Sequence, residues 1–213
     1  MPLLPLLALL LSVAPAGTSA VVAVKHRTGL VVLADRRVVA VGGALSSDGG
    51  DLIVPVASAP GGPVIGATAP VVAQFLRGPL AARLRGENAD GAYADLPARP
   101  RTAAAARVLQ LALGRGNDGV SWEVLCGGVD GGCAHLYLRT ATGAVLEVAR
   151  HAAIGTGAAR AAAYLDAEAD AADNGGVLED AAAAERVARA ALRVALRRDL
   201  EAVPPQVVRL GGG

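Results

Sequence analysis

The amino-acid sequence predicts an α+β domain in which two antiparallel sheets are stacked between pairs of helices. Short apolar runs, bounded by Gly, Pro and polar residues, occur in two groups, at 20–66 and 121–148. Each group is followed by two segments with helical periodicity, and a short apolar run at 206–210 comes last. Strands, two helices, strands, two helices and a final strand are typical of two stacked sheets covered by helix pairs.

Length and composition narrow the possible functions. A chain of 213 residues is one domain of ordinary size, long enough to bury a core. With a net charge of +1 and 18% charged residues, it gives no electrostatic reason to expect binding to nucleic acid or to an anionic membrane. Aromatic residues make up 2%, which leaves the core to Ala, Val and Leu. We therefore expect modest packing and some dependence on partner subunits for stability.

The first predicted element is a β-hairpin. Two apolar runs, 20–24 and 30–34, flank a polar turn at 25–29 that ends in glycine, so they should pair antiparallel. The hairpin then returns Asp35 to the level of Thr18, at the start of its first strand.

The other elements follow in chain order. We expect strands at 38–41, 51–56 and 62–66, helices at 71–85 and 103–113, strands at 121–126, 134–139 and 144–148, helices at 158–172 and 178–200, and a strand at 206–210. The strands before residue 70 should form one sheet. Pro70 favours a helix start, Gly78-Pro79 a kink, and Thr102 a helix cap. A glycine-rich turn is expected at 127–132 and another turn at 155–157.

Gly17-Thr18 immediately precedes the hairpin and suggests a nucleophile. A hydroxyl needs an adjacent base, and a threonine freed at the N-terminus carries one in its own α-amino group. That amine titrates near neutrality, at about 7.7 to 8.0 in peptides. Glycine at position 17 leaves the carbonyl of the bond to be cleaved uncrowded.

Five segments, spread over nearly the whole chain after Gly17, carry a resemblance to a known family. They are Gly17-Thr18, 29–37, 126–137, 154–157 and Arg198-Asp199. In this order they resemble the β-type subunits of the proteasome, within the N-terminal-nucleophile (Ntn) hydrolases. The resemblance implies the Ntn-hydrolase fold, a four-layer α/β/β/α sandwich, and threonine-type endopeptidase activity on unfolded polypeptide. It also implies partners, namely homologous α- and β-type subunits in stacked rings, and a cytoplasmic location, also nuclear in a eukaryote.

The same resemblance assigns roles to individual residues. Thr18 is the nucleophile, while Asp35 and an internal lysine set the electrostatics of the site. Asp199 and two hydroxyl residues orient the nucleophile, and Thr156 stands where the family usually has serine. A backbone N–H at Gly66, in a turn opening the first helix, is the expected oxyanion donor. We expect no cofactor.

Two departures from the family pattern bear on activity. The family's lysine position falls on Asp51, or on Leu52 if the preceding loop holds one extra residue. Lys25, the sole lysine, lies at the far end of the hairpin, roughly 20 Å away. The second departure is Ala202, which replaces a hydroxyl residue, and it is followed by Val203-Pro204-Pro205 in place of glycines. The stretch from Thr18 to Asp35 is also one residue longer than usual.

Residues 1–17 have two interpretations, a pro-segment preceding a domain at 18–213 or a secretory signal peptide. The apolar run 3–13 and Ala14-Pro15-Ala16 resemble a signal peptide, but no positive charge precedes the run and Gly17-Thr18 follows it, which favours the pro-segment. The run is too short to span a bilayer.

The two cysteines and three histidines suggest no metal site. Cys126 and Cys133 are expected to be free thiols in a reducing compartment, and no Cys-His cluster has metal-ligand spacing. Three functional hypotheses remain: an active threonine peptidase subunit, an inactive β-type subunit that serves as ring wall, and a secreted protein of this fold that binds an unknown ligand.

Overall fold

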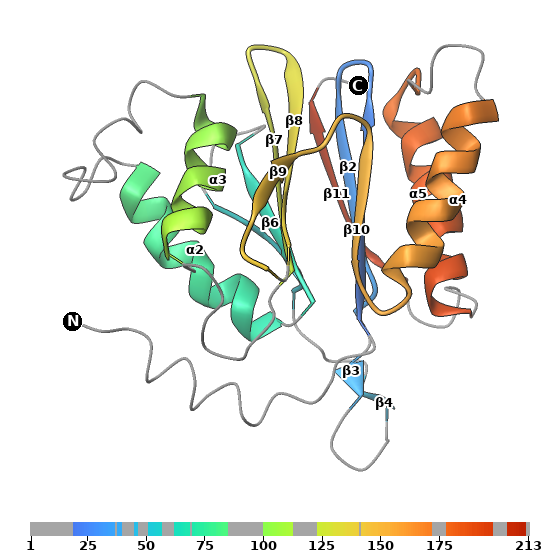
Figure 1. Ribbon diagram of the computed structural model, residues 1–213, viewed down its shortest axis with the longest axis horizontal. Coiled ribbons are helices and arrows are strands. Elements are labelled where there is room, and N and C mark those ends of the chain that lie inside the picture. The colour runs from blue at the N-terminus through green and yellow to red at the C-terminus, as the bar shows by residue number, and fades with distance from the viewer. Residues whose placement is uncertain are drawn as a thin grey trace.

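The structure is a computed structural model that describes residues 19–36, 38–39, 45–46, 51–56, 62–68, 70–84, 100–112, 123–140, 142–171, 178–197 and 204–211. Two antiparallel sheets lie face to face between two helix pairs (Figure 1). One pair is α2 (Pro70–Leu84) and α3 (Arg101–Ala112), and the other is α4 (Ala158–Ala171) and α5 (Ala181–Leu196). The α+β sandwich expected from the sequence is confirmed.

The first sheet contains the N-terminal hairpin. Its strand order is β10-β1-β2-β11, with all neighbours antiparallel. The strands are β1 (Ala20–His26), β2 (Gly29–Ala34), β10 (His151–Gly155) and β11 (Gln206–Gly211). Ala20 pairs with Gly155, and Gln206 pairs with Ala34, so the start of β1 lies at the same end of the sheet as the ends of β2 and β10.

The second sheet has the order β5-β6-β7-β8-β9. Its strands are β5 (Ile53–Pro55), β6 (Val64–Ala67), β7 (Val124–Asp130), β8 (Cys133–Arg139) and β9 (Val145–Glu147). Two short strands, β3 (Val38–Val39) and β4 (Leu45–Ser46), pair only with each other. The expectation of one sheet before residue 70 is therefore wrong, because the chain crosses between sheets after β2.

The continuous apolar sequence of β1 follows from its central position. Side chains alternate between the two faces of a strand. Val22 and Val24 pack against α4 and α5, whereas Val21 and Ala23 pack into the core between the sheets. Both faces are covered, so no position on β1 requires a polar side chain until Lys25 at its far end.

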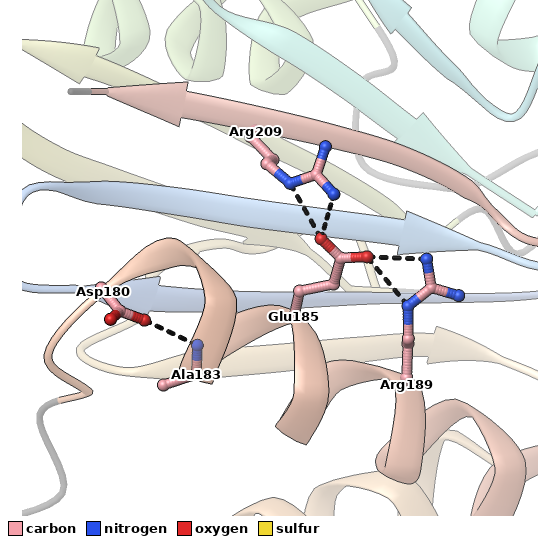
Figure 2. A network of polar contacts seen from close by, with 5 residues as sticks. All are labelled: Asp180, Ala183, Glu185, Arg189 and Arg209. Atoms are coloured by element: carbon pink, nitrogen blue, oxygen red, sulfur yellow. Dashed lines mark hydrogen bonds and ion pairs between the residues drawn. The ribbon is translucent and has the colours of Figure 1, made fainter. Parts of the chain in front are cut away.

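Helix α5 packs on the first sheet through small side chains. Its buried residues are Ala184, Ala188, Ala191, Leu192 and Ala195. Asp180 caps the helix by accepting a 2.7 Å bond from the backbone N of Ala183 (Figure 2). The helix begins and ends inside the expected 178–200, since it starts after this cap and stops at Arg197 in the left-handed conformation, φ 52°.

Glu185 ties α5 to the edge strand β11. Its carboxylate accepts bonds of 2.9 and 2.6 Å from Nε and Nη2 of Arg189, and the other oxygen accepts two bonds from Arg209 (Figure 2). Burial alone raises the pKa of Glu185, but these arginine hydrogen bonds outweigh burial and lower it. The carboxylate is therefore held ionised between two cations.

Three local expectations need correction. The strand β10 was not predicted, and β7 continues through Gly127 and Gly128, so the turn comprises only Gly131 and Gly132. Thr102 is not the cap of α3. Its backbone N instead donates to the carboxylate of Asp130, at 2.9 Å, so the cap is supplied by a neighbouring strand.

Neither cysteine is in a disulfide, as expected: Cys126 is buried and Cys133 is exposed. Among the described residues, no helix has the length and apolar character needed to cross a bilayer.

Candidate active site

The candidate site lies where β1 begins. Thr18 and Asp199, two of the expected site residues, fall outside the described residues, as do residues 1–17 and Ala202. Ser19, the residue that follows the expected nucleophile, is almost fully buried at 1% exposure. The groups around Ser19 therefore define the surroundings of the site.

Asp35 comes to this point at the end of β2. Its backbone N donates to the carbonyl of Ala20 at 3.0 Å, and Asp35 as a whole is fully buried. The hairpin thus returns the aspartate to the start of β1, as predicted, but beside Ala20. The expected turn at 25–29 is too long, because Lys25, His26 and Gly29 are paired strand residues and only Arg27 and Thr28 form the turn. A carboxylate in such surroundings requires polar partners, because an isolated buried charge is costly.

Thr156 reaches the same place from the other neighbouring strand. Its backbone N donates to the carbonyl of Ser19 at 3.1 Å. It lies between Gly155 and Gly157, which have φ of 84° and 72°. A Cβ at Gly155 would come within 2.3 Å of the Ser19 carbonyl oxygen and 2.7 Å of Thr68 Cγ2. Glycine is therefore required there for close packing as well as for its backbone conformation.

Helix α5 ends beside the same turn. A Cβ at Gly157 would lie 2.1 Å from the carbonyl oxygen of Ala195, and Arg160 Nη2 donates to that oxygen. The turn at 155–157 is thus packed between the start of β1 and the carboxyl end of α5.

Asp51 and Leu52, the two residues that could occupy the family's lysine position, face different sides of the chain. Leu52 is fully buried in the core between the sheets. Asp51 is exposed, and its carboxylate lies 3.6 Å from Nη2 of Arg36, with both side chains about half exposed. Position 52 therefore faces the interior and position 51 faces solvent, and neither carries an inward cation.

Gln206 fixes this segment from the opposite sheet. Its Oε1 accepts bonds from the backbone N of Leu52 and of Ile53, at 3.0 and 2.9 Å. Its Nε2 donates to the carbonyl of Ile53 at 2.7 Å. The side chain therefore satisfies backbone groups on the open edge of β5, as a neighbouring strand would.

Gly66 lies inside β6, as the expected strand at 62–66 required, and not in the turn that was expected to begin at this residue. It pairs with Ile53 on one side and Leu125 on the other. A Cβ there would lie 2.9 Å from Val21 Cγ1, so the glycine lets the two sheets approach. Strand β6 continues to Ala67, whose N donates to the carbonyl of Leu52 at 2.9 Å, and the bend falls at Thr68. The role of the Gly66 backbone N–H as oxyanion donor stays a prediction.

Glu123 is a group that sequence reasoning missed. It precedes β7, and its Oε2 accepts a 3.1 Å bond from the backbone N of Gly155 in the other sheet. A glutamate before a strand carries no signal of its own. Only the pairing of Ala67 with Val124 places this carboxylate near Thr68 and the 155–157 turn.

Lys25 lies at the opposite end of β1, where it pairs with Leu30 beside the hairpin turn. Burial lowers its pKa, while the nearby Glu147 carboxylate acts in the opposite direction. The sole lysine of the chain is therefore remote from Ser19. Within the described part of the chain, no three His, Cys, Asp or Glu side chains gather as a metal site would require.

Comparison of the sequence with known proteins gives a match to a family model. No curated protein matches the sequence. The family model described as "Proteasome subunit" matches residues 15–203, most of the chain. This stretch includes β1, β2, β10 and α5, but not β11 with its Gln206. The chain therefore belongs to the proteasome subunit family.

Proposed function

We propose that this chain is a β-type subunit of a 20S-like proteasome core particle, with a threonine site too impaired for more than weak peptidase turnover. Membership of the family implies assembly with other proteasome subunits in rings. The β-type assignment is supported by Gly17-Thr18, one residue before β1, and by Asp35 and Thr156, which directly follow its two neighbouring strands, β2 and β10.

The observation that carries the proposal is the orientation of residues 51 and 52. The inward position holds leucine, fully buried, and the aspartate before it points to solvent, toward Arg36. Without a cation, the pKa of the Thr18 amine should rise and the amine should be protonated, which opposes its action as a base. A cation beside a developing oxyanion would also be missing, and the loss of one oxyanion donor costs about 10²–10³ in turnover in other enzymes.

The remaining parts of the proposal rest on the resemblance of the sequence to β-type subunits. Residues 1–17 are a pro-segment, the polypeptide substrate is unfolded, and the particle is cytoplasmic. A ring-wall role without catalysis is the limiting case of the same proposal. A secreted protein of the same fold is the alternative, and it is favoured only by the apolar run at 3–13.

The test restores the cation. The variant Leu52→Lys places an amine at the inward position, and Asp51→Lys is the matched control at the outward position. Assembled protein is exposed to a threonine-reactive electrophile, and the label on Thr18 is quantified by mass spectrometry. The variant Thr18→Ala, which lacks the hydroxyl, is the negative control. We expect Leu52→Lys to label at least tenfold faster than the unmodified chain and Asp51→Lys to stay within about threefold of it.

Two further measurements keep this result interpretable. Leu52→Met, which conserves volume, shows whether any loss comes from repacking alone. N-terminal sequencing of the unmodified chain reports processing: Met1 first or a mixture supports impaired activity, complete processing to Thr18 favours an active peptidase, and Gly17 first favours the secreted alternative. Labelling of the unmodified chain as fast as Leu52→Lys would refute the account of the missing lysine.

A further inference from the structure

The carboxylate of Glu123 connects the two sheets at the candidate site. Glu123 directly precedes β7, whereas its hydrogen-bond partner is the backbone N of Gly155, the last residue of β10 in the other sheet. Gln206 makes a second polar connection between the sheets, from β11 to β5. The Glu123 bond is therefore placed where relative movement of the sheets would alter the start of β1.

The partner of Glu123 lies next to an expected site residue. Thr156 follows Gly155, and its own N donates to the carbonyl of Ser19. Two successive amides thus point to two different partners, one to Glu123 and one to Ser19. Gly155 and Gly157 have positive φ, so the chain leaves regular strand geometry at the point where these two bonds are made.

We propose that Glu123 is a positioning residue of the site: its carboxylate holds the 155–157 turn against the start of β1 and thereby sets the place of the Thr156 hydroxyl. The inference rests on the proposed function only in treating Thr156 as the group that orients the nucleophile. Glu123 acts as a hydrogen-bond acceptor, so an amide oxygen in its place should suffice. A carboxylate that accepts from a backbone N–H is one of the stronger partners available.

The test measures amide hydrogen exchange residue by residue in the full chain, assembled as it is purified. In Glu123→Ala the amides of Gly155 and Thr156 should both exchange faster, by about fivefold to a hundredfold. The amide of Gly155 loses its acceptor, and the turn that carries Thr156 is then no longer held against Ser19. In Glu123→Gln both should return to within about twofold of the unmodified chain. The amides of β2 serve as an internal reference and should not change.

Glu179→Ala is the matched control, since this exposed carboxylate bonds Arg27 at 3.2 Å, away from the site. It should leave the Gly155 and Thr156 amides unchanged. If Glu123→Ala changes neither amide, or changes Gly155 alone while Thr156 keeps its protection, Glu123 does not position Thr156. If Glu123→Gln fails to restore protection, the acceptor role is wrong.

These outcomes do not depend on peptidase activity. Labelling of Thr18 in the Leu52→Lys series can fail while the exchange results stand, and the reverse also holds. The proposal for Glu123 and the proposed function can therefore be refuted separately.

Discussion

Replacement of Gln206 by alanine should destabilise the fold through the loss of three hydrogen bonds. The side chain satisfies the N of Leu52 and both the N and the carbonyl of Ile53, at 2.7–3.0 Å. Each such bond contributes about 0.5–1.5 kcal/mol net, which gives roughly 1.5–4.5 kcal/mol in total. The contacts are only part-buried, so water can replace some of them, and we expect about 2 kcal/mol.

For a domain of this size, 2 kcal/mol corresponds to a fall in Tm of about 4–8 °C. Urea denaturation and calorimetry of Gln206→Ala would measure both quantities. Gln206→Glu should lose less, because it keeps an acceptor for the two amides but has no donor for the carbonyl of Ile53. Gln110→Ala is the matched control: Gln110 is exposed, accepts a 2.8 Å bond from Arg107, and should change stability by less than about 0.5 kcal/mol when replaced.

A Gln206→Ala variant as stable as Gln110→Ala would refute the reasoning. It would mean that water satisfies the edge of β5 as well as the glutamine does. Gln206→Ala also bears on the candidate active site, because Gln206 holds the segment that contains Leu52.

The other predictions concern titration and thiol reactivity. His26 is buried, and burial lowers its pKa, while the charge of Asp180 acts in the opposite direction. The imidazole therefore binds a proton more readily in the unfolded chain than in the folded one. Stability should fall as pH drops below about 6.5, by up to roughly 1.4 kcal/mol per unit, and His26→Phe should flatten this slope in urea titrations; an unchanged slope contradicts it. For Glu185, whose pKa is lowered, Glu185→Gln should cost about 1 kcal/mol at pH 7, and the difference should shrink as pH falls below 4.5; a pH-independent difference contradicts it. Burial raises the pKa of Cys126 to about 12, so a thiol reagent should modify Cys133 alone in the folded chain, and a second fast-reacting thiol would contradict this.

Local patterns in the sequence account for much of the fold and part of the site. Asp35 was placed correctly because one short turn fixes the pairing of two apolar runs. Helix α5 was found because its apolar residues recur on one face. The strand at 151–155 was missed because His-Ala-Ala-Ile-Gly has one β-branched residue, and its strand conformation depends on pairing with β1.

The contacts of Glu123 and Gln206 could not have been predicted from local sequence. Glu123 bonds a residue 32 positions away, and Gln206 bonds residues about 154 positions away. Both contacts join different sheets, so they exist only once the sandwich has closed. The direction of Leu52 was undecided for a related reason: a one-residue shift of register exchanges the inner and outer faces of a strand.

The alanine face of α5 limits which substitutions the helix can accept. Four of its five buried residues are alanines, at 184, 188, 191 and 195, so there is little side chain to trim at these positions, and glycine costs about 1 kcal/mol in helix propensity. A larger residue must push the helix away from the sheet, which typically costs 1–3 kcal/mol. Because Arg160 and Gly157 contact the carbonyl of Ala195, such a push would also displace the turn that carries Thr156. These four alanines thus fix the distance between the helix and the sheet, and variation at their positions should be restricted to the smallest side chains even far from Ser19.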